Sequence, residues 1–379
     1  MRSFVKMNGD TRRFLSAIAV LVGTCIGAGV LGIPYVASKS GFFVSLFYIF
    51  FIGAIILLVN LYLGEVALRT KGNHQIAGYA NKYLGKRGKI VAQIATLFGI
   101  YSAIVAYLLG VGASLSFLFF GNFNYIIVFG VSFGILMAGL LHRGMKALKR
   151  FERVGVTIIL FLLVFIFAWF FRLINFSNLT TFDSNFLFLP FGVVLFALMS
   201  FHAVPELKII LNKDRKKLKK ALLIGTFVSV VFYALFSFVV VGYMGTNTPE
   251  VATLALGPIF IILGVFTMFT SYLALGNALI ENLEFDEKMS NFGAWFLTSF
   301  IPIILFLLVQ YSGLFSFTMI LSIGGVVSGG LTAVVVLFII RSAKKNGDRK
   351  PEYSVHVNWF IVLALSLIFI LGMVTQFVG

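Results

Sequence analysis

Charged residues are scarce in this sequence. Only 11% of its 379 residues are Asp, Glu, Lys or Arg, whereas 60% are hydrophobic, and the mean hydropathy is +1.03. A soluble core does not need this much apolar surface, so the composition predicts that the chain is solvated by lipid. No stretch between the apolar runs is long enough to hold a soluble domain.

Residues that carry enzyme chemistry are equally few. The chain has one cysteine, Cys25, and four scattered histidines. A single cysteine excludes an internal disulfide and leaves the redox compartment undecided. A membrane-embedded enzyme would need His, Asp or Cys gathered at one place, and the sequence shows no such cluster. We therefore expect neither an enzyme nor a resident cofactor.

Long apolar runs dominate what is present. Eleven of them are long enough to cross a bilayer as helices, so an all-α integral membrane fold is expected. The runs cover residues 14–37, 42–68, 90–119, 123–141, 154–174, 186–211, 221–244, 257–282, 291–310, 313–340 and 357–378.

The basic residues orient these spans. If the N-terminus is cytoplasmic, the connections alternate sides, and all of the 30 Lys and Arg except Lys39 and Arg172 fall inside. This follows the positive-inside rule and predicts an extracytoplasmic C-terminus. The net charge of +17 is therefore a topology signal, with contact to anionic lipid as a minor extra. Nucleic-acid binding is not expected, because no compact basic face remains.

The first span is interrupted. Residues 23–34, GTCIGAGVLGIP, include four glycines and one proline, which are the poorest residues for a helix interior. At membrane depth a broken helix persists only where it is buried in protein or lines a cavity. Such a break offers carbonyls, amides and half-helix ends to a polar ligand.

The sixth span carries a second interruption, Ser200 to Glu206, with the sequence SFHAVPE. Pro205 removes one backbone donor and frees the carbonyl of Phe201. Two interruptions five spans apart indicate a transporter built from inverted repeats. An alternative stays open, in which Gly23 and Gly27 only allow close helix packing and the prolines kink their helices harmlessly.

The repeat interpretation divides the chain into four parts. Residues 1–13 form a cytoplasmic tail, 14–174 the first repeat with spans 1–5, and 186–340 the second repeat with spans 6–10. Residues 357–378 are an additional eleventh span.

Two stretches, GTCIGAGVLGIPYVASKSGF (23–42) and FALMSFHAVPEL (196–207), carry a family resemblance. Over essentially its whole length the chain resembles the amino acid/auxin permease family of the amino acid–polyamine–organocation superfamily, with prokaryotic aromatic and neutral amino acid permeases in particular. The resemblance implies a five-plus-five inverted-repeat fold, as in bacterial leucine transporters. It also implies secondary active uptake of amino acids.

The resemblance places the substrate at the two interruptions. Amides at the start of a half-helix attract a carboxylate, and carbonyls at the end of one attract an ammonium. The neutral character of the region predicts a neutral substrate, and aromatic and branched side chains both stay open. The candidate substrate-binding residues are Thr24, Cys25, Gly27, Ala28, Gly29, Ser200, Phe201, His202 and Ala203, with Tyr101 of the third span as an aromatic wall.

The coupling ion is open between sodium and a proton. By resemblance to sodium-coupled relatives, the carbonyls of Gly23 and Ile26 and the hydroxyls of Thr270 and Ser271 form a candidate sodium site. Adjacent hydroxyls in a helix also commonly bond back to their own backbone. Histidine is the side chain that titrates near neutral pH in general, so His202 is the candidate for proton coupling, although it could instead hydrogen-bond a freed carbonyl.

Two carboxylates near the predicted cytoplasmic ends of spans have different expected roles. Glu65 stands four residues before Arg69, which is a favourable helix pairing, and is expected to be structural. Glu206 follows Pro205, and a gating role and a solvated helix end are equally open for it.

The expected function is secondary active import of neutral amino acids by alternating access, in a multi-pass protein of the cell membrane. The expected partners are the amino acid, Na⁺ or H⁺, and lipid, with no obligatory protein partner evident. The alternative is an amino-acid sensor on the same fold without net transport. A sensor would be expected to have a longer cytoplasmic tail than residues 1–13.

Overall fold

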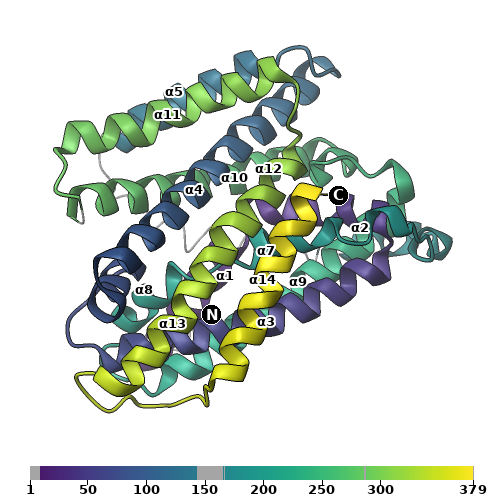
Figure 1. Ribbon diagram of the computed structural model, residues 1–379. Helices are drawn as coiled ribbons and strands as arrows, with labels where there is room; N and C mark the ends of the chain where they lie inside the picture. The colour runs from purple at the N-terminus through teal and green to yellow at the C-terminus, as the bar shows by residue number, and fades with distance from the viewer. Residues whose placement is uncertain (1–8, 143–164, 166, 286, 379) are drawn as a thin grey trace, which may run out of the picture.

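The computed structural model describes residues 9–142, 165, 167–285 and 287–378, in which helices are the only regular structure (Figure 1). The predicted all-α fold is therefore confirmed for this part of the chain. The principal helices are α3 (Phe42–Arg69), α4 (Ile76–Phe120), α5 (Ile126–His142), α9 (Lys217–Met244), α10 (Pro258–Phe285), α11 (Asn291–Ser312) and α14 (Trp359–Val378). The backbone of α4 is kinked at Gly85, where φ is 75°.

Three further spans are interrupted. The first consists of α1 (Gly9–Cys25) and α2 (Ala28–Ser40), and the sixth of α7 (Leu189–Leu198) and α8 (Ala203–Ile210). The tenth consists of α12 (Phe317–Gly324) and α13 (Gly330–Asn346), joined by a π-helical turn, Gly325–Gly329. Both interruptions expected from the sequence are confirmed, and the π turn is a third that the sequence pattern did not indicate.

The described residues hold eight helices long and apolar enough to cross a membrane, nine with the bent pair α1–α2, and the shorter apolar helix α5. The fifth predicted span, 154–174, falls largely outside the residues that the structure describes. The count of eleven therefore stays a prediction.

The helices pack in two groups. One group, called here the bundle, contains the broken first span (α1 and α2) and the broken sixth span (α7 and α8), together with α3 and α9. The other, called the scaffold, contains α4, α5, α10 and α11, and Figure 1 shows α5 and α11 side by side at its far edge. The α12–α13 pair packs against both groups, and α14 lies outside α13. The two interruptions thus lie within one packed unit.

Close packing at Gly29 brings the two broken helices together. A Cβ at this position would lie 2.5 Å from the Cα of Ala197 on α7. That distance is far inside van der Waals contact, so only glycine allows the observed approach of α2 to α7. Small residues have this role in many membrane helix pairs.

The connection from α13 to α14, residues 347–358, lies against the end of α3, and we call it the strap. The N–H groups of Asp348 and Arg349 donate to the carbonyl of Arg69, at 2.9 and 3.2 Å. The Tyr353 hydroxyl donates to the carbonyl of Leu61 at 2.8 Å. Asp348 also accepts from Lys82, which holds the pKa of this carboxyl below its usual value.

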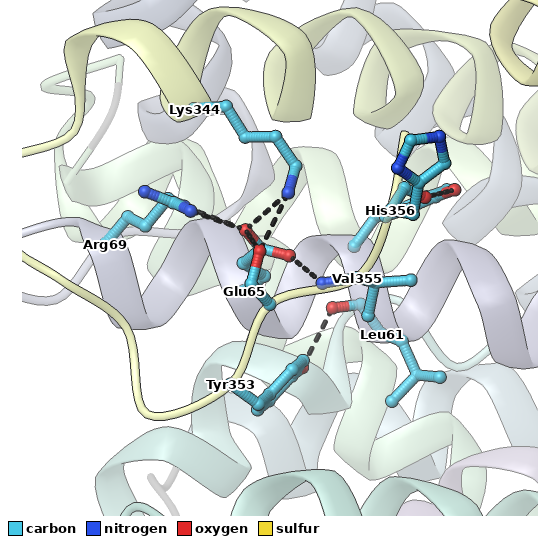
Figure 2. Close-up of polar contacts among 9 residues, drawn as sticks. Leu61, Glu65, Arg69, Lys344, Tyr353, Val355 and His356 are labelled. Carbon is cyan, nitrogen blue, oxygen red and sulfur yellow. Dashed lines mark hydrogen bonds and ion pairs between the residues drawn. The ribbon is translucent and has the colours of Figure 1, made fainter. Parts of the chain in front are cut away.

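Glu65 is the centre of the strap contacts (Figure 2). Its fully buried carboxylate pairs with Arg69 at 2.8 Å and Lys344 at 3.1 Å. It also accepts from the Val355 N–H at 2.6 Å and the Ser354 hydroxyl at 3.0 Å. The predicted pairing of Glu65 with Arg69 is confirmed. The long-range partners follow from the fold, because they lie almost 300 residues away in the chain.

Candidate functional site

The first break leaves both carbonyl and N–H groups of the backbone available for hydrogen bonds. The axes of α1 and α2 differ by 53°. The Ile26 N–H donates to Val22 and the Gly27 N–H to Cys25, whereas the carbonyls of Gly23 and Thr24 accept no hydrogen bond from the described residues. The start of α2 has no side-chain cap. Free carbonyls therefore end α1, and uncapped amides begin α2.

Two hydroxyls from the scaffold reach this break. A Cβ at Gly27 would lie 2.9 Å from the hydroxyl oxygen of Tyr107 on α4 and 3.4 Å from that of Ser271 on α10. The Tyr107 hydroxyl faces both the Ser271 hydroxyl and the Ala28 backbone N–H. The amides of α2 and these two hydroxyls thus converge on one point.

Tyr101, the tyrosine chosen from the sequence, points elsewhere. Its hydroxyl donates to the carbonyl of Leu297 on α11, at 3.4 Å. Tyr107 lies six residues further along the same helix and is the α4 tyrosine that contacts the break. The substrate role of Tyr101 stays a prediction, and Tyr107 is the better placed of the two. Both are tyrosines of the predicted third span, and the sequence does not show which face of that helix points toward the break.

The second break is closed by hydrogen bonds. The last four carbonyls of α7 all have donors. The Met199 N–H serves Leu195 and Phe196, and the Ser200 hydroxyl serves Leu198 at 3.3 Å. The Tyr233 hydroxyl, from α9, lies 2.8 Å from the carbonyl of Ala197. The two breaks are therefore unequal at their helix ends: among the described residues every carbonyl in the last turn of α7 has a donor, whereas those of Gly23 and Thr24 in the last turn of α1 have none.

The residues expected in the second break have different surroundings. Ser200 is buried, and its hydroxyl accepts from the Asn60 amide of α3 at 2.9 Å. Phe201 and Ala203 are also buried. His202 is half-buried at the start of α8, and its ring forms no hydrogen bond with the described residues. His202 is thus the polar side chain of this break with free hydrogen-bonding capacity.

The two hydroxyls of the candidate sodium site separate. Thr270 donates back to the carbonyl of Thr267, at 3.0 Å, whereas Ser271 faces the first break. Of the two candidate carbonyls, that of Gly23 is free of protein donors, and Ile26 is buried beside it. The sodium site stays a prediction, with Ser271 and Gly23 in better positions than Thr270.

Tyr233 is a site residue that the sequence did not indicate. It is fully buried, and its hydroxyl lies 2.6 Å from the carbonyl of Cys25 and 2.8 Å from that of Ala197. The Cys25 thiol itself faces the hydroxyls of Ser200 and Ser229. Tyrosines are common in membrane helices, so only the contact with both breaks distinguishes this one.

The predicted gate residue Glu206 is exposed on α8 and interacts with other groups of the protein. The nearby Lys208 is buried and donates to the carbonyls of Gly72, at 2.6 Å, and Thr70, at 3.2 Å. Lys208 therefore fixes α8 to the connection after α3. The gating role of Glu206 stays a prediction.

Comparison with known proteins assigns the chain to a family. Residues 10–256, about two thirds of the chain, match the tryptophan/tyrosine permease family. The chain belongs to that family. The tryptophan/tyrosine permeases are transport proteins, so this permease is a multi-pass membrane protein and not an enzyme. The broader superfamily resemblance is consistent with this result, whereas the narrower amino acid/auxin permease name is not confirmed.

Individual relatives match this permease over almost their full length. It is 26% identical to tyrosine-specific transport system 1 of Haemophilus influenzae, with 93% of both chains covered. It is 24% identical to glutamine transporter 2 of Aliivibrio fischeri, with 94% of this chain and 97% of the relative covered. The crystal structure of MhsT in complex with L-phenylalanine matches with a TM-score of 0.70 at 14% identity, covering 96% of this chain and 98% of MhsT. That likeness shows a shared fold.

Proposed function

We propose that this permease is a secondary active importer of neutral amino acids, with aromatic ones preferred, that works by alternating access. The observation that carries the proposal is the polarity of the first break. The substrate carboxylate would bind the amides that begin α2, near Ala28 and Tyr107, and the ammonium would bind the carbonyls that end α1. The half-helix dipoles favour the same orientation, because a helix start attracts anions and a helix end attracts cations.

The side chain of the substrate is proposed to be uncharged. The residues of both breaks, 26–27 and 199–202, include no carboxylate and no Lys or Arg. A buried charge on the substrate would need an opposite charge there, because an unpaired charge in such a place is costly. The family description names tryptophan and tyrosine, and one relative is named for glutamine. All three are neutral amino acids.

The architecture is proposed to be a five-plus-five inverted repeat with a cytoplasmic N-terminus. Interruptions at the first and sixth predicted spans support this repeat, as does the fold shared with MhsT. In this arrangement 14–174 and 186–340 are the repeats, and 357–378 is the added span. The bundle, which contains both breaks, would move against the scaffold and expose the substrate to each side in turn.

Coupling is proposed to use either sodium or a proton. The free Gly23 carbonyl and the Ser271 hydroxyl at the break support a sodium site. The unpaired ring of His202 supports proton coupling, because a histidine can take up and release a proton near neutral pH. Each candidate depends on different residues, so the two can be separated by mutation.

The test is uptake of labelled L-tyrosine, L-tryptophan, L-phenylalanine and L-glutamine into proteoliposomes, with sodium and pH gradients applied separately. We expect saturable uptake that one gradient drives. If sodium drives uptake, Ser271→Ala should weaken it and His202→Gln should not. If the pH gradient drives uptake, His202→Gln should weaken it and Ser271→Ala should not.

Two results would contradict the proposal. Measurable binding of a neutral amino acid without uptake under either gradient would favour the sensor alternative. Unchanged uptake in a Gly27→Leu variant would remove the substrate from the first break, because that side chain would collide with Tyr107.

A further inference from the structure

The Tyr233 hydroxyl has two acceptors and one proton. It lies 2.6 Å from the carbonyl oxygen of Cys25 and 2.8 Å from that of Ala197. A hydroxyl donates one hydrogen bond and can accept two others. At any moment the hydroxyl therefore donates to one carbonyl, and the other carbonyl goes without this donor.

The two carbonyls differ in the other hydrogen-bond donors available to them. The Cys25 carbonyl also accepts the Gly27 N–H at 3.0 Å, whereas the described residues offer the Ala197 carbonyl no donor other than Tyr233. A buried carbonyl without a donor destabilises the structure. The hydroxyl is therefore more strongly required at Ala197 whenever another donor reaches Cys25.

Both carbonyls stand at the ends of half-helices. Cys25 is the last residue of α1, and Ala197 is next to the last residue of α7. The negative ends of two helix dipoles thus meet at one neutral hydroxyl, which makes this point attractive to a positive group. The Tyr233 side chain is fully buried on α9, so its hydroxyl is held in place between the two ends.

We propose that Tyr233 is a positioning residue for the substrate ammonium. In the empty protein its proton is shared between the two carbonyls. When an ammonium binds at Cys25, the hydroxyl donates to Ala197 and accepts from the ammonium with a lone pair. Binding of substrate in the first break thereby strengthens the hydrogen bond from Tyr233 on α9 to Ala197 on α7. In this way the second break responds to the substrate.

This proposal rests on the proposed function, because it needs an amine at the end of α1. It adds a residue from a third helix and a route by which the two breaks communicate. The neighbouring contact of Asn60 with Ser200 ties the same break to α3. A stronger hydrogen bond at Ala197 would therefore act on a break that α3 already holds through the contact of Asn60 with Ser200.

The test compares Tyr233→Phe with Tyr272→Phe. Both tyrosines are fully buried, Tyr233 on α9 of the bundle and Tyr272 on α10 of the scaffold. The Tyr272 hydroxyl, however, has no hydrogen-bond partner among the described residues. Phe preserves the ring packing in each case. We expect Tyr233→Phe to raise the KM for L-phenylalanine uptake about 10- to 100-fold with little change in the maximal rate. Tyr272→Phe should keep the wild-type KM.

A second readout uses Cys25, the single cysteine of the chain. Without substrate, loss of the Tyr233 hydroxyl should loosen α1 and speed maleimide labelling of Cys25, and Tyr272→Phe should not. L-Phenylalanine should slow labelling in the wild type and less so in Tyr233→Phe.

The outcomes separate the possibilities. Faster labelling or a lower Tm in Tyr233→Phe with an unchanged KM would make the hydroxyl a structural tie only, and would overturn this proposal while the transport function stands. If the wild type takes up none of the four amino acids, the proposed function fails, and this proposal fails with it.

Discussion

Single residues decide how near the two broken helices come. Gly29 is the clearest case, because the backbone of Ala197 occupies the space where a side chain would be. A side chain at position 29 would meet backbone atoms of α7, so no rotation of a neighbouring side chain could relieve the clash. The position of Gly29 thus sets the distance between the breaks.

We expect Gly29→Ala to abolish uptake and to destabilise the protein, because overpacking in a rigid core costs about 1–3 kcal/mol. Gly139→Ala, on α5, is the matched control, since no atom lies within 4 Å of its Cβ position. Thermal unfolding in detergent and uptake in proteoliposomes measure the two effects. Normal uptake by Gly29→Ala would contradict the observed approach of α2 to α7.

At the scale of elements, the ends of half-helices carry the chemistry. The α7 end is fully supplied with donors, and the α1 end is not. A helix end without partners in a membrane is costly unless something occupies it. The open end of α1 is therefore the place where substrate or ion would gain the most free energy.

The strap is the second element with a clear physical role. Glu65 holds it by two ion pairs and two hydrogen bonds, so the C-terminal end of α3 is tied to residues 347–358. Glu65→Gln keeps an acceptor oxygen but removes the charge that pairs with Arg69 and Lys344. We expect the strap to detach and trypsin to cut after Arg349 at least several times faster, since hydrogen bonds to charged groups contribute about 1.5–3 kcal/mol.

Glu250→Gln provides the control for the strap experiment. Glu250 accepts from the Thr318 N–H at the start of α12, away from the strap. Its replacement should leave the cleavage rate after Arg349 unchanged. A wild-type cleavage rate in Glu65→Gln would show that the strap is held without the charge.

At the scale of the whole molecule, the proposed alternating access would use the separation into bundle and scaffold. Both breaks belong to the bundle, whereas Tyr107 and Ser271 reach the first break from the scaffold. A substrate there would contact both groups. A relative movement of the groups would then change the surroundings of the substrate on its two sides.

The orientation of the molecule is a prediction that a labelling experiment can check. In a Cys25→Ser background, Lys39→Cys is expected outside and Lys345→Cys inside, because basic residues concentrate on the cytoplasmic side. A membrane-impermeant thiol reagent applied to intact cells should label Lys39→Cys only. Labelling of Lys345→Cys instead would reverse the proposed orientation.

The sequence by itself located the breaks. Glycine and proline disfavour a helix wherever they stand, so 23–34 and Ser200–Glu206 could be recognised without knowing what surrounds them. The charge distribution likewise led to a membrane protein with a predicted orientation. The pairing of Glu65 with Arg69 was accessible because it lies within one turn of a helix.

Tertiary structure alone decided which side chains meet at the breaks. Tyr107, and not Tyr101, lies against Gly27, because the rotation of α4 about its axis is set by packing against other helices. Tyr233 and Asn60 reach the breaks from α9 and α3, at separations of 208 and 140 residues from Cys25 and Ser200. Local preferences act over a few residues, whereas these contacts depend on how whole helices pack.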